Sequence, residues 1–337
     1  MRPDFQQTDF TYVMGGPLLG AQNWPVLASV PPGAQFTKLP LRLDTDAPFL
    51  LRSIAARVQY DPATPPASAQ AFTHRQTNLN FLQFRFTGPT AQYLQQVPVP
   101  ILLQTPFAGQ CGNPMPLQRQ VYYPAGGLIQ VDLLSTAPTQ TLTNVTLYFR
   151  GVKLWPWGVR RYYPFPRQIS VSPYAYSFGE SPPEFPTLYQ IPVTQAAGTP
   201  IRRLLNFDKD GDFVLRTIQA GPSPNANFSW EVFFRLRDSD EYPYSNDFVH
   251  ADVMCGNSTG PAAFPTGSGL SGPAGGFLQA FQVGPALPGL IFPEVYLPNH
   301  QFMWLDIARS DAAFVGVGAV AQDFPVALQG VKVFQVS

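Results

Sequence analysis

The sequence predicts an all-β protein made of two tandem β-sandwich, jelly-roll-like domains, and three observations carry this prediction. The chain has 337 residues, about twice the length of an ordinary domain. Its 38 Pro and 27 Gly recur along the whole chain, which leaves little room for long helices. A pattern of residues in the first half also recurs in the second half, so one type of domain is expected twice.

Three short landmarks occur in the same order in both halves of the chain. The first is the pattern Asp-x-Asp-x-x-Phe-x-Leu-Arg-x-Ile. The second is Val-Tyr-x-Pro with an Asp eight residues after the Pro, and the third is Gly-Val-Lys. In that order they occupy residues 44–54, 121–132 and 151–153 of the first half, and residues 208–218, 295–306 and 330–332 of the second half. Since chance is a poor explanation for three ordered matches, we interpret the halves as an internal repeat.

Short apolar segments bounded by Pro, Gly and Asn fill both halves, and their alternation is typical of strands. In the first half the expected strands are residues 49–60, 79–86, 99–103, 120–123, 129–134 and 145–155. In the second half they are residues 213–220, 228–237, 248–254, 277–283, 294–297, 302–308 and 326–336. This number of strands in each half indicates an antiparallel sandwich or jelly roll.

The repeat divides the chain into four predicted segments. Residues 1–34, rich in Gln, Gly and Pro, are expected to form an extended N-terminal arm that becomes ordered on a neighbour. Residues 35–155 form the first β-sandwich domain and residues 201–337 the second. Residues 156–200 between them are a Pro- and aromatic-rich linker, which we expect to pack as a strap against both domains or a partner, because exposed aromatics at this density would cause aggregation.

The chain carries few charges. Charged residues make up 12% of it, about half the usual fraction. The 21 Lys and Arg balance the 21 Asp and Glu, and a net charge of zero favours association. No apolar run approaches the length of about 18 residues that spans a bilayer, and the first residues lack an apolar signal core, so we expect neither membrane insertion nor export. We therefore expect the protein to be part of an assembly.

Motifs for catalysis, cofactors and metals are sparse. Cys111 and Cys255 are the only two cysteines, too few for a disulfide scaffold or a paired zinc motif, and reduced buried thiols are expected. The three histidines are scattered, and the sequence contains no phosphate-binding loop and no nucleophile elbow. The sequence thus predicts no enzyme activity, no cofactor and no metal.

Two groups of carboxylates are candidates for metal binding or catalysis. Asp208, Asp210 and Asp212 are spaced like the start of a calcium loop. Position twelve of that loop is Gln219 instead of Glu, so a turn before a strand is favoured and calcium binding stays open. The paired Asp132 and Asp306 fall within strands, where satisfying backbone donors or contacting a partner is favoured over catalysis.

The strap supplies the candidate partner-binding residues. Its mixture of arginines and aromatics could stack on nucleic acid, but stacking of arginine on aromatic rings within the strap is favoured because the chain as a whole is neutral. The candidates are Trp155, Trp157, Arg160, Arg161, Tyr162, Tyr163 and Phe165.

A carbohydrate- or receptor-binding module is the alternative from another functional class. Tyr242, Tyr244 and Phe248 would then form a stacking platform, and the acids among residues 238–241 would bind hydroxyl groups. The same cluster is equally typical of a turn between two strands. The Gly-rich residues 256–276 are expected to belong to a long loop, and whether that loop binds a host receptor stays open.

The order of the landmarks resembles that of jelly-roll virion structural proteins of tailed bacteriophages. The residues that carry the resemblance are 49–54, 109–116, 124–133 and 151–155, with their counterparts in the second half. The resemblance implies a non-enzymatic capsid decoration (cement), minor capsid or accessory head-tail protein, which stabilises a capsid lattice through its sandwich domains and its arm.

The same resemblance implies a location in the virion, after assembly in the host cytoplasm. The implied partners are the major capsid protein or other virion proteins and further copies of the chain, without nucleic acid or membrane. Two alternatives stay open: a double-jelly-roll major capsid protein, and a carbohydrate- or receptor-binding module of a phage tail or fibre that takes a host-surface glycan.

Overall fold

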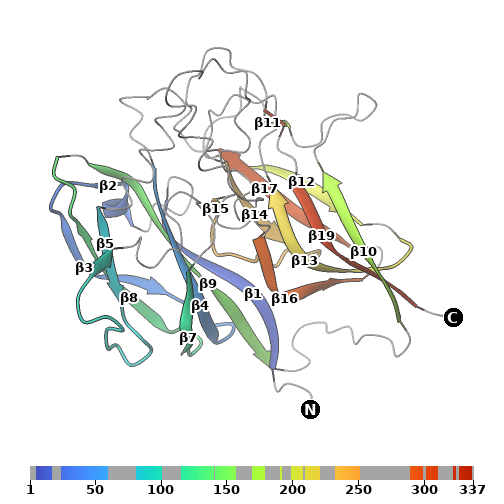
Figure 1. Ribbon diagram of the computed structural model, residues 1–337, viewed down its shortest axis with the longest axis horizontal. Coiled ribbons are helices and arrows are strands. Elements are labelled where there is room, and N and C mark those ends of the chain that lie inside the picture. The colour runs from blue at the N-terminus through green and yellow to red at the C-terminus, as the bar shows by residue number, and fades with distance from the viewer. Residues whose placement is uncertain are drawn as a thin grey trace, which may run out of the picture. The chain divides into compact units, whose positions relative to one another are not determined.

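Strands make up nearly all the regular structure of the chain, as the computed structural model shows (Figure 1). The structure describes residues 5–16, 24–59, 81–100, 115–139, 141–156, 169–178, 190–191, 199–207, 209–220, 232–250, 289–298, 301–309, 322–323 and 326–335. Within these ranges the only helix is a three-residue 3-10 turn, so the predicted all-β class is confirmed. The chain divides into one unit of Met1–Arg160 with Ser245–Phe248 and another of Arg161–Tyr244 with Val249–Ser337.

The first unit contains two antiparallel sheets. Its elements are β1 (Phe5–Gly15), η2 (Pro25–Leu27), β2 (Ser29–Val30), β3 (Gln35–Arg42), β4 (Phe49–Gln59), β5 (Leu82–Phe86), β6 (Val99–Pro100), β7 (Met115–Tyr123), β8 (Leu128–Ser135) and β9 (Leu142–Pro156). One sheet has the order β1-β9-β4-β7, with the short β2 also paired to β9, and the other has the order β3-β8-β5-β6.

The described strands of the second unit also form two antiparallel sheets, each with four strands. Its strands are β10 (Ile169–Phe178), β11 (Gln190–Ile191), β12 (Ile201–Asn206), β13 (Asp212–Ala220), β14 (Val232–Arg237), β15 (Val249–His250), β16 (Gly289–Leu297), β17 (Phe302–Arg309), β18 (Gln322–Asp323) and β19 (Val326–Gln335). The sheets have the orders β10-β19-β13-β16 and β12-β17-β14-β15, and β11 pairs with β18 in a separate ribbon.

The eight main strands follow the same order in both units. When the strands of each unit are numbered 1 to 8 along the chain, leaving out β2, β11 and β18, one sheet of each unit has the order 1-8-3-6 and the other has the order 2-7-4-5. Eight strands in two such sheets are the arrangement of a jelly roll. That the halves are repeats of one domain stays a prediction, with which these strand orders agree.

Buried side chains join the two sheets of the first unit. Phe86 of β5 and Phe149 of β9 meet edge to face, with ring centroids 6.1 Å apart. The Tyr123 hydroxyl of β7 donates a 2.7 Å hydrogen bond to the carbonyl of Thr87, which follows β5. Both contacts run from one sheet to the other, so the first unit is a sandwich with an aromatic core.

The Phe and Gly landmarks pack against each other in both units. A Cβ on Gly151 would collide with the Leu50 carbonyl and lie 2.8 Å from the Phe49 ring. On Gly330 it would collide with the Val214 carbonyl and lie 3.1 Å from the Phe213 ring. Glycine therefore lets the last strand of each unit approach the neighbouring strand and its Phe ring closely.

The arginine of the Phe-x-Leu-Arg landmark marks a β-bulge in each unit. The pairing of β4 with β7 and β9 shifts between Leu51 and Ser53, and the pairing of β13 with β16 and β19 shifts between Leu215 and Thr217. The skipped residues are Arg52 and Arg216. A bulge adds one residue to a strand and re-aims its side chains, which explains why an arginine interrupts the apolar alternation there.

Two predicted segments differ from the structure. Phe5–Gly15 of the predicted arm is an edge strand of the first unit, paired with β9 over its whole length. Phe10, Tyr12 and Met14 of this strand are buried, so its alternating apolar residues outweigh the Gln-rich composition that suggested an arm. Likewise Ile169–Phe178 of the predicted strap pairs with β19 and is the first strand of the second unit.

Candidate functional site

The charged landmarks of each half form an ion pair. The Lys153 ammonium lies 2.6 Å from a carboxylate oxygen of Asp44 and 2.8 Å from one of Asp46, and it stands 3.9 Å above the Phe10 ring centroid. In the second unit, the Lys332 ammonium lies 2.8 Å from the Asp210 carboxylate. Both lysine side chains are almost fully buried. The Asp-x-Asp and Gly-Val-Lys landmarks are therefore two sides of one structural contact.

These contacts favour the turn over the calcium loop at residues 208–212. Asp210 binds Lys332, and Asp212 accepts a hydrogen bond from the Tyr296 hydroxyl, while Asp208 lies outside the described residues. In the part of the chain that the structure describes, no three His, Cys, Asp or Glu side chains lie close enough together to hold a metal ion. Cys111, Cys255 and the Gly-rich residues 256–276 also lie outside the described residues.

Asp132 is the buried centre of a polar site on β8. One carboxylate oxygen accepts 2.7 and 2.8 Å hydrogen bonds from the Lys38 backbone N–H and the Tyr93 hydroxyl. The other accepts from Arg85, whose Nε lies 2.8 Å away and whose guanidinium stacks 3.9 Å from the Tyr93 ring centroid. Lys38 has a φ of 55° at an irregular point of β3, and this turns its N–H toward the carboxylate. The site thus combines one cation with two neutral donors.

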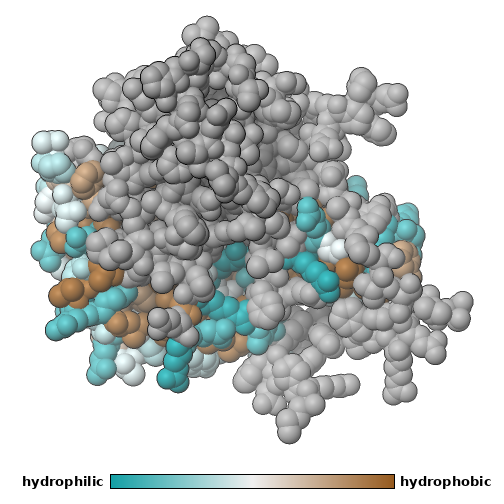
Figure 2. Space-filling model, in the orientation of Figure 1, coloured by the Kyte–Doolittle hydropathy of each residue, from teal (hydrophilic) through white to brown (hydrophobic). Residues whose placement is uncertain are grey.

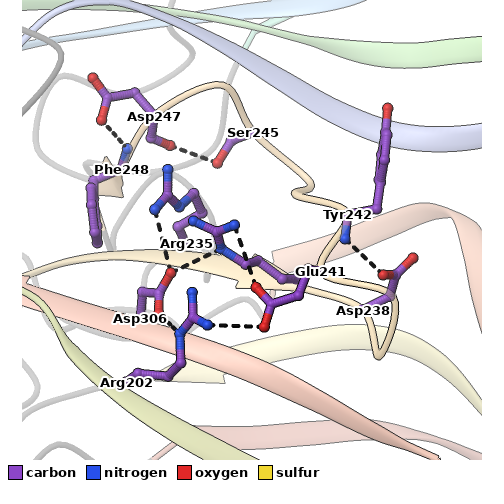
Figure 3. A network of polar contacts seen from close by, with 10 residues as sticks. Arg202, Arg235, Asp238, Glu241, Tyr242, Ser245, Asp247, Phe248 and Asp306 are labelled. Atoms are coloured by element: carbon purple, nitrogen blue, oxygen red, sulfur yellow. Dashed lines mark hydrogen bonds and ion pairs between the residues drawn. The ribbon is translucent and has the colours of Figure 1, made fainter. Parts of the chain in front are cut away.

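Asp306 is the corresponding carboxylate on β17, and three arginines surround it (Figure 3). The Nε of Arg202 lies 2.8 Å from one carboxylate oxygen, and the Nε of Arg237 lies 3.0 Å from the other. Arg235, which faces Asp306 across the strands, adds a contact of 3.4 Å. Glu241 bridges Arg202 and Arg237 at 2.9 and 3.6 Å. Asp306 and Glu241 therefore share two of the three arginines, Arg202 and Arg237.

The pKa of both central carboxylates lies below its ordinary value. Burial alone would raise the pKa of Asp306, but hydrogen bonds and charges from Arg202 and Arg237 outweigh burial. Burial likewise opposes ionisation of Asp132, and the Lys38 N–H, Arg85 and Tyr93 outweigh it. Both groups are therefore ionised at neutral pH, and both bind arginine side chains of their own unit; of the backbone contacts that the sequence favoured, the described residues show the Lys38 N–H on Asp132.

The loop with the predicted sugar-stacking residues is a turn that recurs in the first unit. The Glu241 N–H donates to the Asp238 carbonyl with Glu241 at a φ of 64°, and the Ala91 N–H donates to the Gly88 carbonyl with Ala91 at a φ of 60°. Asp238 also accepts hydrogen bonds from the N–H groups of residues 240 and 242. Tyr244 and Phe248 are buried, so two of the three proposed stacking rings offer little surface to a sugar.

The structure tests little of the predicted partner-binding set. Trp155 lies on β9 with 6% of its surface exposed, so its ring packs within the chain instead of projecting as an anchor. The other candidates, Trp157, Arg160, Arg161, Tyr162, Tyr163 and Phe165, lie outside the described residues.

The sequence revealed the two central aspartates but not their arginines. Arg85 and Arg235 each follow a Phe in a short strand, at 84–85 and 234–235, and this shared pair was the available signal. The first half has other residue types at the positions that correspond to Arg202, Arg237 and Glu241. These positions are occupied by Lys38, Thr87 and Ala91, respectively. A search for repeated residues therefore missed them.

No protein-family model and no curated protein matches the chain. The resemblance to phage virion proteins has no support from these two comparisons. Among the described residues, no helix is both long enough and apolar enough to cross a membrane.

Solved structures give only weak likenesses. A peptide-N(4)-(N-acetyl-β-D-glucosaminyl)asparagine amidase is 9% identical with a TM-score of 0.21, and the match covers 98% of this chain and 97% of that one. The ANXUR2 extracellular domain from Arabidopsis thaliana is 8% identical with a TM-score of 0.22 and the same coverage. A chain of infectious bursal disease virus, Gx strain, is 12% identical with a TM-score of 0.20, covering 98% and 72%. TM-scores of this size carry no argument about fold or function.

Proposed function

We propose that this chain is a non-enzymatic structural protein of a virus particle, which acts in the virion by binding neighbouring chains of the capsid. The observation that carries the proposal is the presence of two eight-stranded jelly-roll units in one chain. Eight-stranded jelly rolls build viral capsid domains, and lectins and cupins use them too. The chemistry of the surface supports the capsid role among these.

Internal ion pairs use a large share of the few charges. Among the described residues, at least seven basic and seven acidic side chains pair within their own unit, out of 21 of each in the chain. They are Arg85, Arg150, Lys153, Arg202, Arg235, Arg237 and Lys332 with Asp9, Asp44, Asp46, Asp132, Asp210, Glu241 and Asp306. Because only 12% of the residues of the chain are charged, desolvation of its surface on association costs little.

Exposed apolar side chains add to this surface. Leu94 and Val97 lie between β5 and β6 with 48% and 59% of their surfaces exposed, and Tyr122 on β7 is 51% exposed. Figure 2 shows hydrophobic side chains interspersed with hydrophilic ones on the visible face of the described residues. We expect Leu94, Val97 and Tyr122 to be among the side chains that contact neighbouring chains.

Two forms of the capsid role follow from different observations. The resemblance of the landmarks to phage virion proteins favours a decoration or minor capsid protein bound to a lattice made by another chain. The presence of two jelly-roll units favours the second candidate, a double-jelly-roll major capsid protein that forms the lattice itself. In either form the partners are capsid chains, and copies of this chain are among them.

Co-sedimentation with purified particles tests the proposal. Particles from the source of the chain are separated on a density gradient, washed at low and at high salt, and probed with an antibody against the chain. We expect the chain in the particle fraction after both washes, because apolar contacts hold it there. A chain that stays at the top of the gradient as a free monomer would contradict the proposal.

A further inference from the structure

The two units carry opposite net charges, although the chain as a whole is neutral. The first unit, Met1–Arg160 with Ser245–Phe248, contains 11 basic and 7 acidic side chains, which gives a net charge of +4. The second unit contains the other 10 basic and 14 acidic side chains, which gives a net charge of −4. Surfaces of opposite charge attract each other, and surfaces of like charge are kept apart. The first unit of one copy therefore complements the second unit of another copy.

The positive charge of the first unit lies on its surface. Within the described part of residues 1–160, every aspartate forms an ion pair inside the unit, namely Asp9, Asp44, Asp46 and Asp132. Lys38, Arg42 and Arg119 are exposed, and none of the three forms an ion pair with another described residue. These cations are therefore exposed to solvent and can contact a partner.

Lys38 and Arg42 lie on β3, which is the outermost strand of the sheet β3-β8-β5-β6. Arg42 pairs with Leu128 of β8, whose side chain is 40% exposed, so an apolar side chain borders this cation. Lys38 has a φ of 55°, and Pro40 has no N–H, while its carbonyl already accepts the Trp24 indole N–H. These features make β3 unsuited to pairing with an added strand. A partner at β3 is therefore expected to bind through side chains.

The turn after β14 carries exposed negative charge on the second unit. This acidic turn, residues 238–241, contains Asp238, Asp240 and Glu241, and the half-buried Tyr242 follows it (Figure 3). Asp240 is exposed and forms no ion pair with a described residue, and the Glu241 side chain is 46% exposed. The same turn in the first unit, residues 88–91, has the same backbone hydrogen bonds and contains no acid. The carboxylates of Asp240 and Glu241 are therefore additions that the turn itself does not need.

We propose that the acidic turn of one copy docks on Lys38 and Arg42 of β3 in the first unit of a neighbouring copy, in a head-to-tail contact. The inference rests on the proposed function, because it states which surfaces of this chain meet when copies assemble. A head-to-tail contact joins two different surfaces, so it can repeat from copy to copy into a ring or a lattice. The charges select which surfaces meet, and apolar side chains such as Leu128 and Tyr242 add contact area.

A second copy fits the cations of the first unit better than nucleic acid does. Lys38 and Arg42 lie on β3 and Arg119 lies on β7, which are edge strands of two different sheets. Binding to a phosphate backbone draws on many cations gathered along one face. The second unit, by contrast, supplies a net negative charge equal in size to the positive charge of the first.

Sedimentation velocity of the purified full chain, measured over a range of concentrations, tests the contact. We expect self-association that weakens about tenfold between about 0.05 M and about 0.5 M salt, because salt screens exposed charges. Arg42→Glu and Asp240→Lys should each weaken it about tenfold, since each brings like charges together. Lys209→Glu is the matched control, because it reverses an exposed cation on the acidic unit, and it should weaken association by less than about twofold.

A mixture of the two variants gives the sharpest readout. Arg42→Glu keeps the acidic turn, and Asp240→Lys keeps the cations of β3, so the mixture should associate more tightly than either variant alone. The contact would be overturned by a chain that stays monomeric, by association that salt does not change, by equal losses in Arg42→Glu and Lys209→Glu, or by a mixture no tighter than its components. The substituted side chains are exposed, so the variants are expected to fold, and circular dichroism verifies this.

Co-sedimentation with particles separates this contact from the capsid role. A chain that self-associates as predicted but stays out of the particles keeps the head-to-tail contact and loses the capsid role. A chain that is found in the particles, but whose mixed variants do not recover association, keeps the capsid role and loses the contact.

Discussion

Asp132 and Asp306 occupy corresponding strands of the two units, yet they are neutralised in different ways. Asp132 receives one arginine, one hydroxyl and one backbone N–H, whereas Asp306 receives three arginines and shares two of them with Glu241. The first arrangement has no charge excess and is closed by the chain itself. The second gathers more charged side chains and has a partly exposed rim of Arg202 and Glu241. A structural carboxylate within a strand can thus be kept while the number of cations around it changes.

Removing the central carboxylates should give the largest difference between the units. Asp306→Asn leaves three guanidinium groups around a neutral amide, and we expect it to lower the free energy of unfolding by about 3 to 5 kcal/mol. Asp132→Asn leaves one arginine beside a neutral amide. The amide oxygen of the new side chain still accepts a hydrogen bond from Tyr93 or Lys38, so we expect a loss of about 1 to 3 kcal/mol in the free energy of unfolding. Urea unfolding followed by circular dichroism measures both. If both variants lost the same free energy of unfolding, the additional arginines around Asp306 would not need its negative charge.

Acid should distinguish both Asn variants from the original chain. The pKa of Asp306 in the folded protein lies below its ordinary value of 3.8, so its stabilisation is present above pH 3.8 and is lost as the pH falls through the lower folded pKa. Asp132 has the same sign. Stability should therefore fall less steeply in acid in either Asn variant than in the original chain. Urea midpoints measured from neutral to strongly acid pH test this, and parallel curves for all three chains would contradict it.

Tyr93→Phe should produce a smaller effect, confined to the first site. The substitution removes one hydrogen bond to Asp132 and keeps the ring that stacks on Arg85, so we expect a loss of about 0.5 to 1.5 kcal/mol in the free energy of unfolding. Tyr122→Phe serves as the control, because this β7 side chain is 51% exposed and removal of its hydroxyl should change stability little. If both substitutions had the same effect, the hydroxyl of Tyr93 would not be specific to the Asp132 site.

Glu241→Gln should have the smallest effect on stability. Its ion pairs are exposed, and such pairs contribute about 1 kcal/mol or less to folding. A thermal midpoint close to that of the original chain is therefore expected. A large drop in the midpoint would show that the exposed ion pairs of Glu241 contribute more to folding than their exposure indicates.

The landmarks of the sequence were recognisable because specific packing fixes them. Gly151 and Gly330 admit a neighbouring strand and a Phe ring, and Lys153 and Lys332 neutralise the acids before β4 and β13. Each contact needs particular residue types, so the residues recur in sequence. These contacts account for most of what the sequence predicted about the fold.

The rest of the correspondence was hidden by loops of different length. Strands β5 and β14 correspond at an offset of 150 residues, since Phe84 pairs with Val99 and Phe234 with Val249, whereas the Asp-x-Asp landmarks have an offset of 164. Apolar packing accepts many side chains, so β5 and β14 share little beyond a Phe-Arg pair. Strands β1 and β10 were assigned to an arm and a strap because the Gln-, Gly- and Pro-rich composition of residues 1–34 and the Pro-rich composition of residues 156–200 outweighed the strand pattern within them.

The role of the chain in a capsid is tested most directly by cryo-electron microscopy of the intact particle from its source. The account predicts density for two jelly-roll units at regular, symmetry-related positions, bound on the lattice for a decoration or minor capsid protein and forming it for a major capsid protein. Particles whose lattice is fully explained by other chains, with no density for this one, would contradict the account.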